Sequence, residues 1–204
     1  MLLGGVKWLL KTRICIFYGM TVLLHICCGP CAIYPLDVLK GEGLRVQGYF
    51  HNPNIHPYRE FKKRLEAVEL LASRLDLPVE YKREYGLHEY LRRVVFNEES
   101  RCRLCYDMRL GAAAEQARKI GADAFTTTLL YSRYQNHEFI RHKAEELANE
   151  YKIPFYYHDF REGWQQGIDM SKEMGLYRQS YCGCIYSEQE RYDKRFRTKK
   201  SRKN

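Results

Sequence analysis

The chain has 204 residues, 45% of them hydrophobic, which is enough for one domain with a full core. A domain of this size needs no disulfide framework, and the apolar stretch at residues 14–26 is too short to span a bilayer. The net charge is +9, but the last fourteen residues alone hold eight Lys or Arg side chains and one Asp. Such a tail favours a polyanionic partner, most simply nucleic acid, although a solvated, disordered end is the alternative.

The N-terminal segment resembles a signal peptide only superficially. Basic residues precede the apolar stretch, but Gly19 and the cysteines interrupt it, and a small-residue cleavage pattern is missing. "MTVLLHICC" reads as a natural entry into a first strand. We therefore expect the native start at Met20, and residues 1–19, with Cys15, to be a dispensable leader.

Short apolar runs predict five strands, and longer segments with an apolar helical face predict helices between them. The strands are expected at residues 22–26, 44–50, 79–82, 124–130 and 153–157. The helices are expected at residues 32–40, 56–75, 86–96, 106–120, 136–151 and 164–174, and after Gly183. This alternation predicts an α/β fold, a parallel sheet with helices on both faces. We expect an α/β domain over residues 20–160, a helical extension over residues 161–190 and a basic tail over residues 191–204.

Seven of the eight cysteines fall in short-range groups. These groups are Cys27, Cys28 and Cys31, then Cys102 and Cys105, then Cys182 and Cys184. Disulfides within such groups would close tiny loops and restrict the unfolded chain little. Clustered thiols therefore point to metal or redox chemistry in a reducing compartment, and we expect a cytoplasmic protein.

Fold geometry is expected to bring these groups together. Cys27 follows the first strand, and Cys102 lies just before a helix whose N-terminus faces the same carboxyl edge of the sheet, where ligands bind in such folds. Four thiolates without an obvious His suggest zinc or an iron–sulfur cluster. The 70 residues between Cys31 and Cys102 do not suit a zinc ribbon. Ligand softness and an open site favour iron–sulfur.

Two other interpretations stay open. Cys28-Gly-Pro-Cys31 follows a strand and opens a helix, as in a thioredoxin-like thiol–disulfide oxidoreductase, but this leaves Cys102 and Cys105 unexplained. The other is a zinc-stabilised RNA-binding module without catalysis. Cys182 and Cys184 could form a readily reduced disulfide, offer two metal ligands, or simply pack as small apolar residues.

Polar residues near the predicted strand ends are candidates for the same site. Asp159 follows the fifth strand and is either a salt-bridge partner of Arg161 or a carboxylate ligand for a metal. The side chains expected to contact a substrate, by stacking on a base or by hydrogen bonding, are Tyr131, Tyr134, Gln135, Tyr181, Arg178 and Gln179.

Six motifs in order, "HICCGPC", "NPNIHP", "RCRLCYDMRL", "FTTTLLYSRYQN", "DFREG" and "YRQSYCGC", resemble the cobalamin-independent epoxyqueuosine reductases, the QueH family. The resemblance spans residues 22–187. It implies a two-electron reduction of the epoxide of epoxyqueuosine at a tRNA wobble position, with a [4Fe–4S] cluster, a second iron and an unidentified electron donor, and without cobalamin.

The same resemblance implies roles for individual residues. Cys27, Cys28, Cys102 and Cys105 would be the cluster ligands, and Cys182 and Cys184 a redox-active pair. A second iron held by cysteines and an aspartate would draw on a thiol of these groups and on Asp159, with Asp107 in reserve. The role of Cys31 is left open.

The architecture is also similar to PP-loop tRNA-thiolation enzymes, which implies a Rossmann-like (HUP-type) fold with five parallel strands. Those enzymes carry a Ser-Gly-Gly-x-Asp-Ser loop after the first strand that cradles ATP phosphates. Here "CCGPCA" stands in its place, so ATP is not expected.

Overall fold

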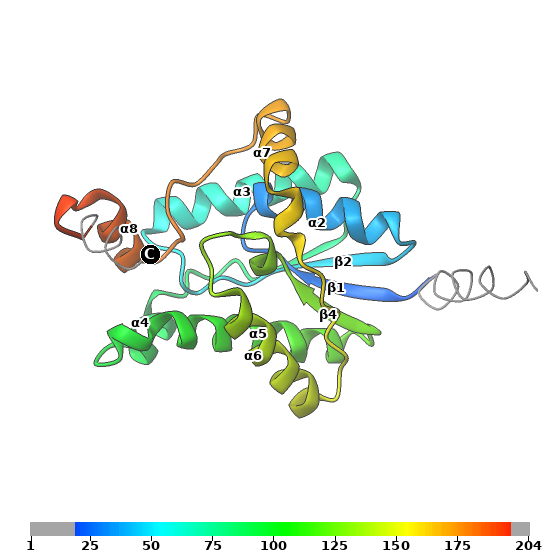
Figure 1. Cartoon of the computed structure of the whole chain (residues 1–204), viewed down its shortest axis with the longest axis horizontal. Helices are drawn as coiled ribbons and strands as arrows, with labels where there is room; N and C mark the ends of the chain where they lie inside the picture. Colours follow the sequence, from blue (N-terminus) through cyan, green and yellow to red (C-terminus); the bar gives the residue numbers. More distant parts are fainter. Residues whose placement is uncertain (1–18, 197–204) are drawn as a thin grey trace, which may run out of the picture.

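The computed structural model describes residues 19–196, and its centre is a parallel sheet (Figure 1). Four strands pair in the order β3-β2-β1-β4. Their bounds are β1 Thr21–His25, β2 Arg45–Phe50, β3 Val79–Tyr81 and β4 Ala124–Thr127. The leader up to residue 18, with Cys15, and the tail from residue 197 lie outside the described part, so the proposals for them stay predictions.

β1 is the central strand because its apolar run is buried on both faces. Val22, Leu23 and Leu24 are at most 1% exposed. β1 pairs with β2 from Thr21 opposite Arg45, and with β4 up to His25 opposite Thr127. The carboxyl ends of the parallel strands therefore share one edge of the sheet. The chain segments that follow β1 and β4 both begin at this edge.

The prediction of a fifth strand at residues 153–157 is wrong. Only a single parallel bridge, Phe125 to Phe155, joins this segment to β4. Pro154 has no N–H to donate, so the ladder cannot continue through it. β4 is also shorter than predicted, because residues Thr128–Tyr131 form the 3-10 helix η2, whose N-cap Thr127 accepts from the Leu129 N–H at 3.1 Å.

Helices cover both faces of the sheet, as predicted (Figure 1). One layer holds α2 and α3 with α7 packed on α2, and the other holds α4, α5 and α6. The bounds are α2 Gly29–Gly41, α3 Tyr58–Leu75, α4 Leu87–Val94, α5 Arg101–Lys119, α6 His137–Tyr151, α7 Trp164–Glu173 and α8 Ile185–Tyr192. All seven predicted helices are present.

α5 begins five residues earlier than predicted, and this difference matters for the site. A short 3-10 turn, η1 (Glu98–Ser100), leads directly into α5 at Arg101. Cys102 and Cys105 therefore lie inside the helix, near its N-terminus, rather than in a loop before it. Their spacing of three residues puts both on one side of the helix.

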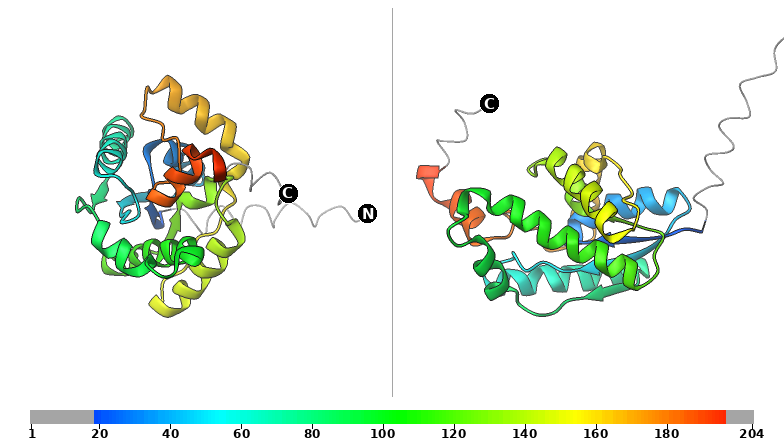
Figure 2. Two further views of the ribbon diagram at one scale, coloured as in Figure 1. Left: turned by 90° about the vertical axis from the view of Figure 1, so that its left-hand side faces the viewer. Right: turned by 90° about the horizontal axis from the view of Figure 1, so that it is seen from below.

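The C-terminal segment returns to the carboxyl edge of the sheet. After α7, which lies over α2, residues 174–184 run back toward this edge, and α8 lies across it (Figure 2). The predicted helices of the extension are thus confirmed. Within residues 19–196, no helix is long and apolar enough to cross a membrane.

Candidate metal centre

The first group of thiols, called here the triad, is Cys27, Cys28 and Cys31. Cys27 directly follows β1, Cys28 is the N-cap of α2, and Cys31 lies in the first turn of that helix. The three sulfur atoms lie within 4.8 Å of one another, and the Cys27 and Cys28 sulfurs are 3.8 Å apart. Sulfurs around a single tetrahedral zinc would be about 3.8 Å apart, given Zn–S bonds of about 2.3 Å. The spacing in the triad is thus short enough for a shared metal.

The start of α2 is shaped to bring these thiols close. A side chain on Gly29 would place its Cβ 2.8 Å from the Ala67 carbonyl oxygen of α3, so only glycine fits. Pro30 stands in the first turn, where its missing N–H costs nothing. The Cys27 N–H donates to Thr128 Oγ1 at 3.0 Å, which ties the triad to the end of β4.

The electrostatics of the triad favour one thiolate among three thiols. Hydrogen bonds from Cys28 and Cys31 hold the pKa of Cys27 well below its usual value, with help from the Arg109 charge. Burial raises the pKa of Cys28, and hydrogen bonds with the other two thiols raise that of Cys31. The Gln179 side-chain amide lies 2.9 Å from the Cys28 sulfur and 3.4 Å from the Cys31 sulfur. A cation bound here would replace the remaining two thiol protons.

The second group, called here the helical group, is Cys102, Cys105, Cys182 and Cys184. The first two lie in α5, while Cys184 is the N-cap of α8 and accepts from the Ser187 N–H at 3.4 Å. Cys105 and Cys184 are buried in one small cluster with Tyr90, Val94 and Met108. Burial, together with the nearby Cys182 and Cys184, raises the pKa of Cys105 to about 12.

Cys102 and Cys182 stand on the solvent side of the helical group. Both residues are exposed, yet desolvation by the protein around the sulfur raises the pKa of each thiol. The Cys102 thiol is close enough to Cys182 and Cys184 for their charges to act on it. The helical group is therefore a second gathering of soft ligands, open to solvent on one side.

A buried arginine holds the Cys182 segment in place. Arg64 of α3 donates to the carbonyl oxygens of Cys182 at 2.7 Å and Tyr181 at 2.9 Å, and pairs with Glu60 at 2.7 Å. Gly183 follows with a φ of +148°, and its carbonyl accepts from the His56 N–H at 2.7 Å. These contacts join residues more than a hundred positions apart, so the helical group exists only in the folded chain.

Two glutamines predicted from the sequence contact the thiols. Gln179 touches the triad, as described above, and the Gln135 amide lies 3.1 Å from the Cys182 sulfur. Gln135 is itself oriented by the Tyr106 hydroxyl, which donates to its side-chain oxygen at 2.7 Å. Both side chains therefore border the site, one at each thiol group.

The predicted aromatic and basic contacts divide between core and surface. Tyr131 is buried, stacks on Trp164 and donates its hydroxyl to the Trp164 carbonyl at 2.8 Å. Tyr134 is 86% exposed and meets the edge of the same tryptophan. Arg178 is exposed, and the Tyr181 hydroxyl donates to the His56 carbonyl at 2.6 Å. Their contacts with a substrate stay predictions.

Asp159 has the salt bridge that the sequence offered as one of its two interpretations. Arg161 binds both of its carboxylate oxygens, at 2.8 and 2.6 Å, and these hydrogen bonds lower the pKa of Asp159 to about 2. The reserve carboxylate, Asp107, pairs with Arg93 and Lys143. Either carboxylate would have to give up an ion pair to bind a metal.

A match to a protein-family model covers residues 22–190, and the description of that family is epoxyqueuosine reductase QueH. The chain belongs to the QueH family of epoxyqueuosine reductases. It is 39% identical over 173 residues to "Epoxyqueuosine reductase QueH" of Dehalococcoides mccartyi, covering 85% of this chain and 95% of the relative. It is 35% identical over 184 residues to the protein of the same name from Thermotoga maritima, covering 85% and 93%. The chain is thus an oxidoreductase by family.

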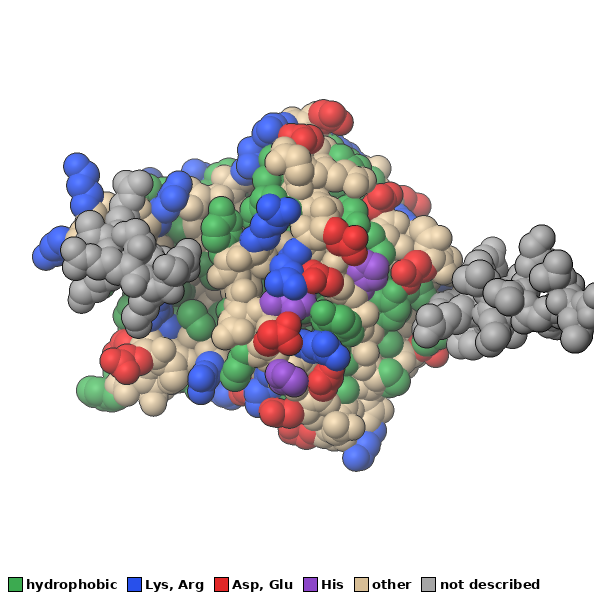
Figure 3. Space-filling model, in the orientation of Figure 1, with side chains coloured by type: hydrophobic (Ala, Val, Ile, Leu, Met, Phe, Trp, Pro, Cys, Tyr) green, Lys and Arg blue, Asp and Glu red, His purple; other side chains and the backbone are tan. Residues whose placement is uncertain are grey.

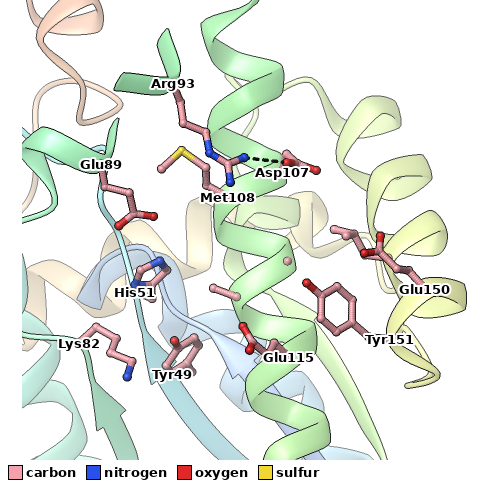
Figure 4. A pocket seen from close by; sticks show the side chains of 13 residues that line it. Tyr49, His51, Lys82, Glu89, Arg93, Asp107, Met108, Glu115, Glu150 and Tyr151 are labelled. Carbon is pink, nitrogen blue, oxygen red and sulfur yellow. Dashed lines mark hydrogen bonds and ion pairs between the residues drawn. The ribbon is translucent and has the colours of Figure 1, made fainter. Parts of the chain in front are cut away.

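A separate cavity of about 550 Å³ lies on the α5 side of β2 and β3 (Figure 4). His51 and Lys82 line it from the sheet, and Arg93 reaches to Asp107 across its rim. None of the described cysteines lines it, but Met108 does, and Met108 also packs against the helical group. The cavity therefore lies behind the thiols, not over them.

The sequence interpretation missed two residues of the site. Cys31 was placed with Cys27 and Cys28 and in the thioredoxin-like alternative, but not among the metal ligands, although its sulfur lies within 4.8 Å of theirs. Arg109, 2% exposed, lies between the thiol groups, and its Nη1 is 3.8 Å from the Cys105 sulfur. Its position four residues after Cys105 in one helix was the signal that could have revealed it.

Proposed function

We propose that the protein reduces the epoxide of epoxyqueuosine in tRNA to queuosine, with an iron–sulfur centre bound by the thiols at the carboxyl edge of the sheet. The observation that carries this is the triad, three sulfurs within 4.8 Å of one another, beside Arg109, whose charge also acts on Cys105 and Cys182. Family membership supports the reaction. The soft, partly open ligand set supports iron–sulfur over a closed structural zinc.

The donor set fits a cluster better than a single ion. A single tetrahedral zinc takes four ligands, whereas the two groups offer seven sulfurs, enough for a cluster and a further metal. Cys27 and Cys28 from the triad, with Cys102 and Cys105 from the helical group, would bind a [4Fe–4S] cluster. When bound, such a cluster supplies electrons one at a time. Cys31, 8% exposed and beside both triad partners, is an alternative ligand on that side.

The Cys182–Cys184 pair suits the electron balance of the reaction. Converting the epoxide to an alkene breaks two C–O bonds and consumes two electrons and two protons, with release of water. Oxidation of two thiols to a disulfide releases two electrons and two protons. An external electron donor would then reduce the disulfide again.

A second iron would draw on the remaining ligands. A thiol of Cys182 or Cys184 with Asp159 would hold it, and the Asp159–Arg161 salt bridge would have to open first. Asp159→Ala tests this directly: total iron per chain falls while the cluster absorbance persists. An unchanged iron content would leave Asp159 with its salt bridge alone.

The surface beside the thiols supports an RNA substrate. Tyr134 is exposed next to Trp164, and the Arg133 guanidinium lies 5.8 Å from the centre of the tryptophan ring. Bases unstacked from an RNA loop bind to such aromatic and guanidinium surfaces. In Figure 3, several Lys and Arg side chains stand at the end of the molecule that carries α8. They would attract the phosphates of a tRNA anticodon arm.

The finer points of the fold are part of this proposal. The strand order β3-β2-β1-β4, with helices on both faces, is consistent with a Rossmann-like fold of the HUP type. We also propose a cytoplasmic location, because the thiols need a reducing compartment. We also propose an α/β domain of residues 20–160 and an extension of residues 161–190. In this division, Cys182 and Cys184 belong to the extension.

Anaerobic purification followed by iron, sulfide and zinc analysis, with a mass-spectrometric assay on tRNA containing epoxyqueuosine, tests the proposal. We expect iron with inorganic sulfide, and conversion to queuosine when a chemical reductant is supplied. Zinc without conversion would favour a zinc-stabilised RNA-binding module. Metal-free protein that reduces disulfides through Cys28 and Cys31 would favour a thiol–disulfide oxidoreductase.

A further inference from the structure

Two arginines are buried side chains of this fold, and their partners differ. Arg64 and Arg109 are each 2% exposed. Arg64 has an acidic partner, Glu60, and two backbone carbonyls, as described above. Within residues 19–196, Arg109 has no carboxylate partner, and its Nε has no hydrogen-bond acceptor. Its one hydrogen bond in the same part of the chain runs to the Cys105 sulfur.

The groups around Arg109 are thiols and neutral imidazoles. Its charge acts on Cys105 from its own helix, on Cys27 from the triad and on Cys182 from the C-terminal segment. His25 and His51 face it from β1 and from the end of β2. An imidazole is neutral or positively charged, so neither histidine can neutralise Arg109.

A buried guanidinium without an anion is strongly destabilising, because it has lost its hydration and gained no counter-charge. Arginine cannot escape this cost by losing its proton. Within residues 19–196, the only hydrogen-bond partner of the Arg109 side chain is a sulfur, the ligand type of a soft metal centre. Several thiolates bound to one metal centre would carry a net negative charge and compensate it fully.

We propose that Arg109 is the buried counter-charge of an anionic thiolate–metal centre that spans the triad and the helical group. It is a positioning residue: it binds no substrate, but it stabilises the loaded centre and raises its reduction potential by favouring added negative charge. The inference deepens the proposed function, but it requires only that a thiolate–metal centre forms, whatever the reaction.

Three substitutions separate charge from shape. Arg109→Met removes the charge and keeps much of the volume, Arg109→Gln keeps a polar donor without charge, and Arg109→Lys keeps the charge. Arg118→Met is the matched control, because Arg118 is exposed on the last turn of the same helix, α5. If Arg109→Met fails to fold, the comparison of Arg109→Gln with Arg109→Lys carries the test.

The first measurement compares the melting temperature of each variant with metal and after chelation. We expect the increase in melting temperature on metal loading to shrink in Arg109→Met and Arg109→Gln, and to persist in Arg109→Lys and Arg118→Met. Metal release to a chelator should accelerate in the two uncharged variants by on the order of a hundredfold, since each leaves the centre without its counter-charge. A purely structural role would lower the loaded and metal-free melting temperatures equally.

The second measurement is the reduction potential of the anaerobically loaded protein, without substrate. It should become more negative in the uncharged variants and stay near the wild-type value in Arg109→Lys. An unchanged potential and unchanged metal release in Arg109→Met would overturn the inference. Should the bound metal be zinc, the melting and release measurements still decide the role of Arg109, while the iron-based reductase proposal would fail separately.

Discussion

The triad and the helical group both consist of cysteines, but they differ in how far apart their members lie in the sequence. The triad comes from one stretch of five residues between β1 and α2, and its three sulfurs lie within 4.8 Å of one another. The helical group joins α5 to a segment some eighty positions later, and two of its four cysteines are exposed. The first is local and buried, the second is long-range and open. A centre that uses both has one side fixed by the core and one side accessible to a substrate.

Removing one cysteine from each group tests whether they form one centre, and here the largest effect is expected. Cys28→Ser and Cys105→Ser should each remove the iron–sulfur absorbance and lower turnover by more than about a hundredfold, since even the loss of outer-shell support costs about that much. Iron and sulfide analysis measures the first effect. Cys15→Ser is the control. Full absorbance in Cys105→Ser would separate the helical group from the centre.

Arg64→Met should disturb the helical group more than the triad. Arg64 holds the Cys182 segment by a hydrogen bond, and it acts on Cys28 of the triad through its charge. Removing one partner of a buried ion pair typically costs about 3–5 kcal/mol, and Glu60 would be left unpaired. We expect faster alkylation of Cys182 in the metal-free protein and an unchanged rate for Cys31. The double variant Arg64→Met with Glu60→Gln should recover much of the lost stability. Equal acceleration at both cysteines would mean that Arg64 supports the whole edge.

Cys182→Ser and Cys184→Ser should affect turnover more than stability. We expect a loss of about a hundredfold in turnover if the pair supplies the two electrons. Cys182→Ser should change the free energy of unfolding by less than about 0.5 kcal/mol, because the residue is exposed. Single-turnover assays and denaturant unfolding measure the two effects. Wild-type turnover in either variant would show that the two cysteines contribute only to packing.

His51 should make the fold sensitive to acid independently of the helical group. His51 has a pKa of about 4 in the folded protein, below its ordinary value of 6.5, because it is buried near Arg109 and Lys82. As the pH falls from 6.5 toward 4, His51 therefore binds a proton in the unfolded chain but stays neutral in the folded chain. His51 should reduce stability by about 1.4 kcal/mol per pH unit in that window.

Denaturant unfolding at several pH values measures this slope. His51→Gln should reduce the slope by one proton, and Cys105→Ser should leave it unchanged, because burial keeps the Cys105 thiol protonated over this range. A slope that falls in Cys105→Ser instead would assign the acid sensitivity to that thiol.

The basic tail should give the smallest effect, on affinity alone. Cutting the chain after Glu190 would break α8, whose Glu190 pairs with Arg101, so a cut after Phe196 is the cleaner truncation. It removes five Lys or Arg side chains. The slope of the logarithm of the tRNA binding constant against the logarithm of the salt concentration should become shallower by about 0.7–0.9 for each lost phosphate contact. Turnover at saturating tRNA should be unchanged. An identical salt slope would show that this tail does not touch RNA.

The local features of this molecule could be predicted from sequence, and the long-range ones could not. The buried run at β1 and the helical periodicity of α3 and α6 identify those elements by themselves. Pro154 stands in the predicted fifth strand, but whether it prevents strand pairing depends on whether a neighbouring strand needs a hydrogen bond from that position. The early start of α5 was missed because "RCRLC" carries no capping signal, and Ser100 makes no side-chain cap.

The site shows the same limit. The topology of parallel strands predicts that Cys27 and Cys102 lie at the same edge of the sheet, whereas the environment of Arg109 does not follow from its position in α5. Asp159 had two interpretations from sequence, and only the neighbouring Arg161 geometry reveals the salt bridge. Charge pairing in a buried site depends on contacts between segments, which periodicity does not encode.

The distance in sequence between the two thiol groups also sets an order of events during protein synthesis. The triad can form as soon as β1 and α2 have left the ribosome, and Cys102 and Cys105 follow with α5. Cys182 and Cys184 emerge only about eighty residues later, after the sheet is complete. A nascent chain that acquired metal early would bind it without the open side of the site. If the proposed centre uses both thiol groups, metal would have to reach the finished fold, rather than the growing chain, to complete it.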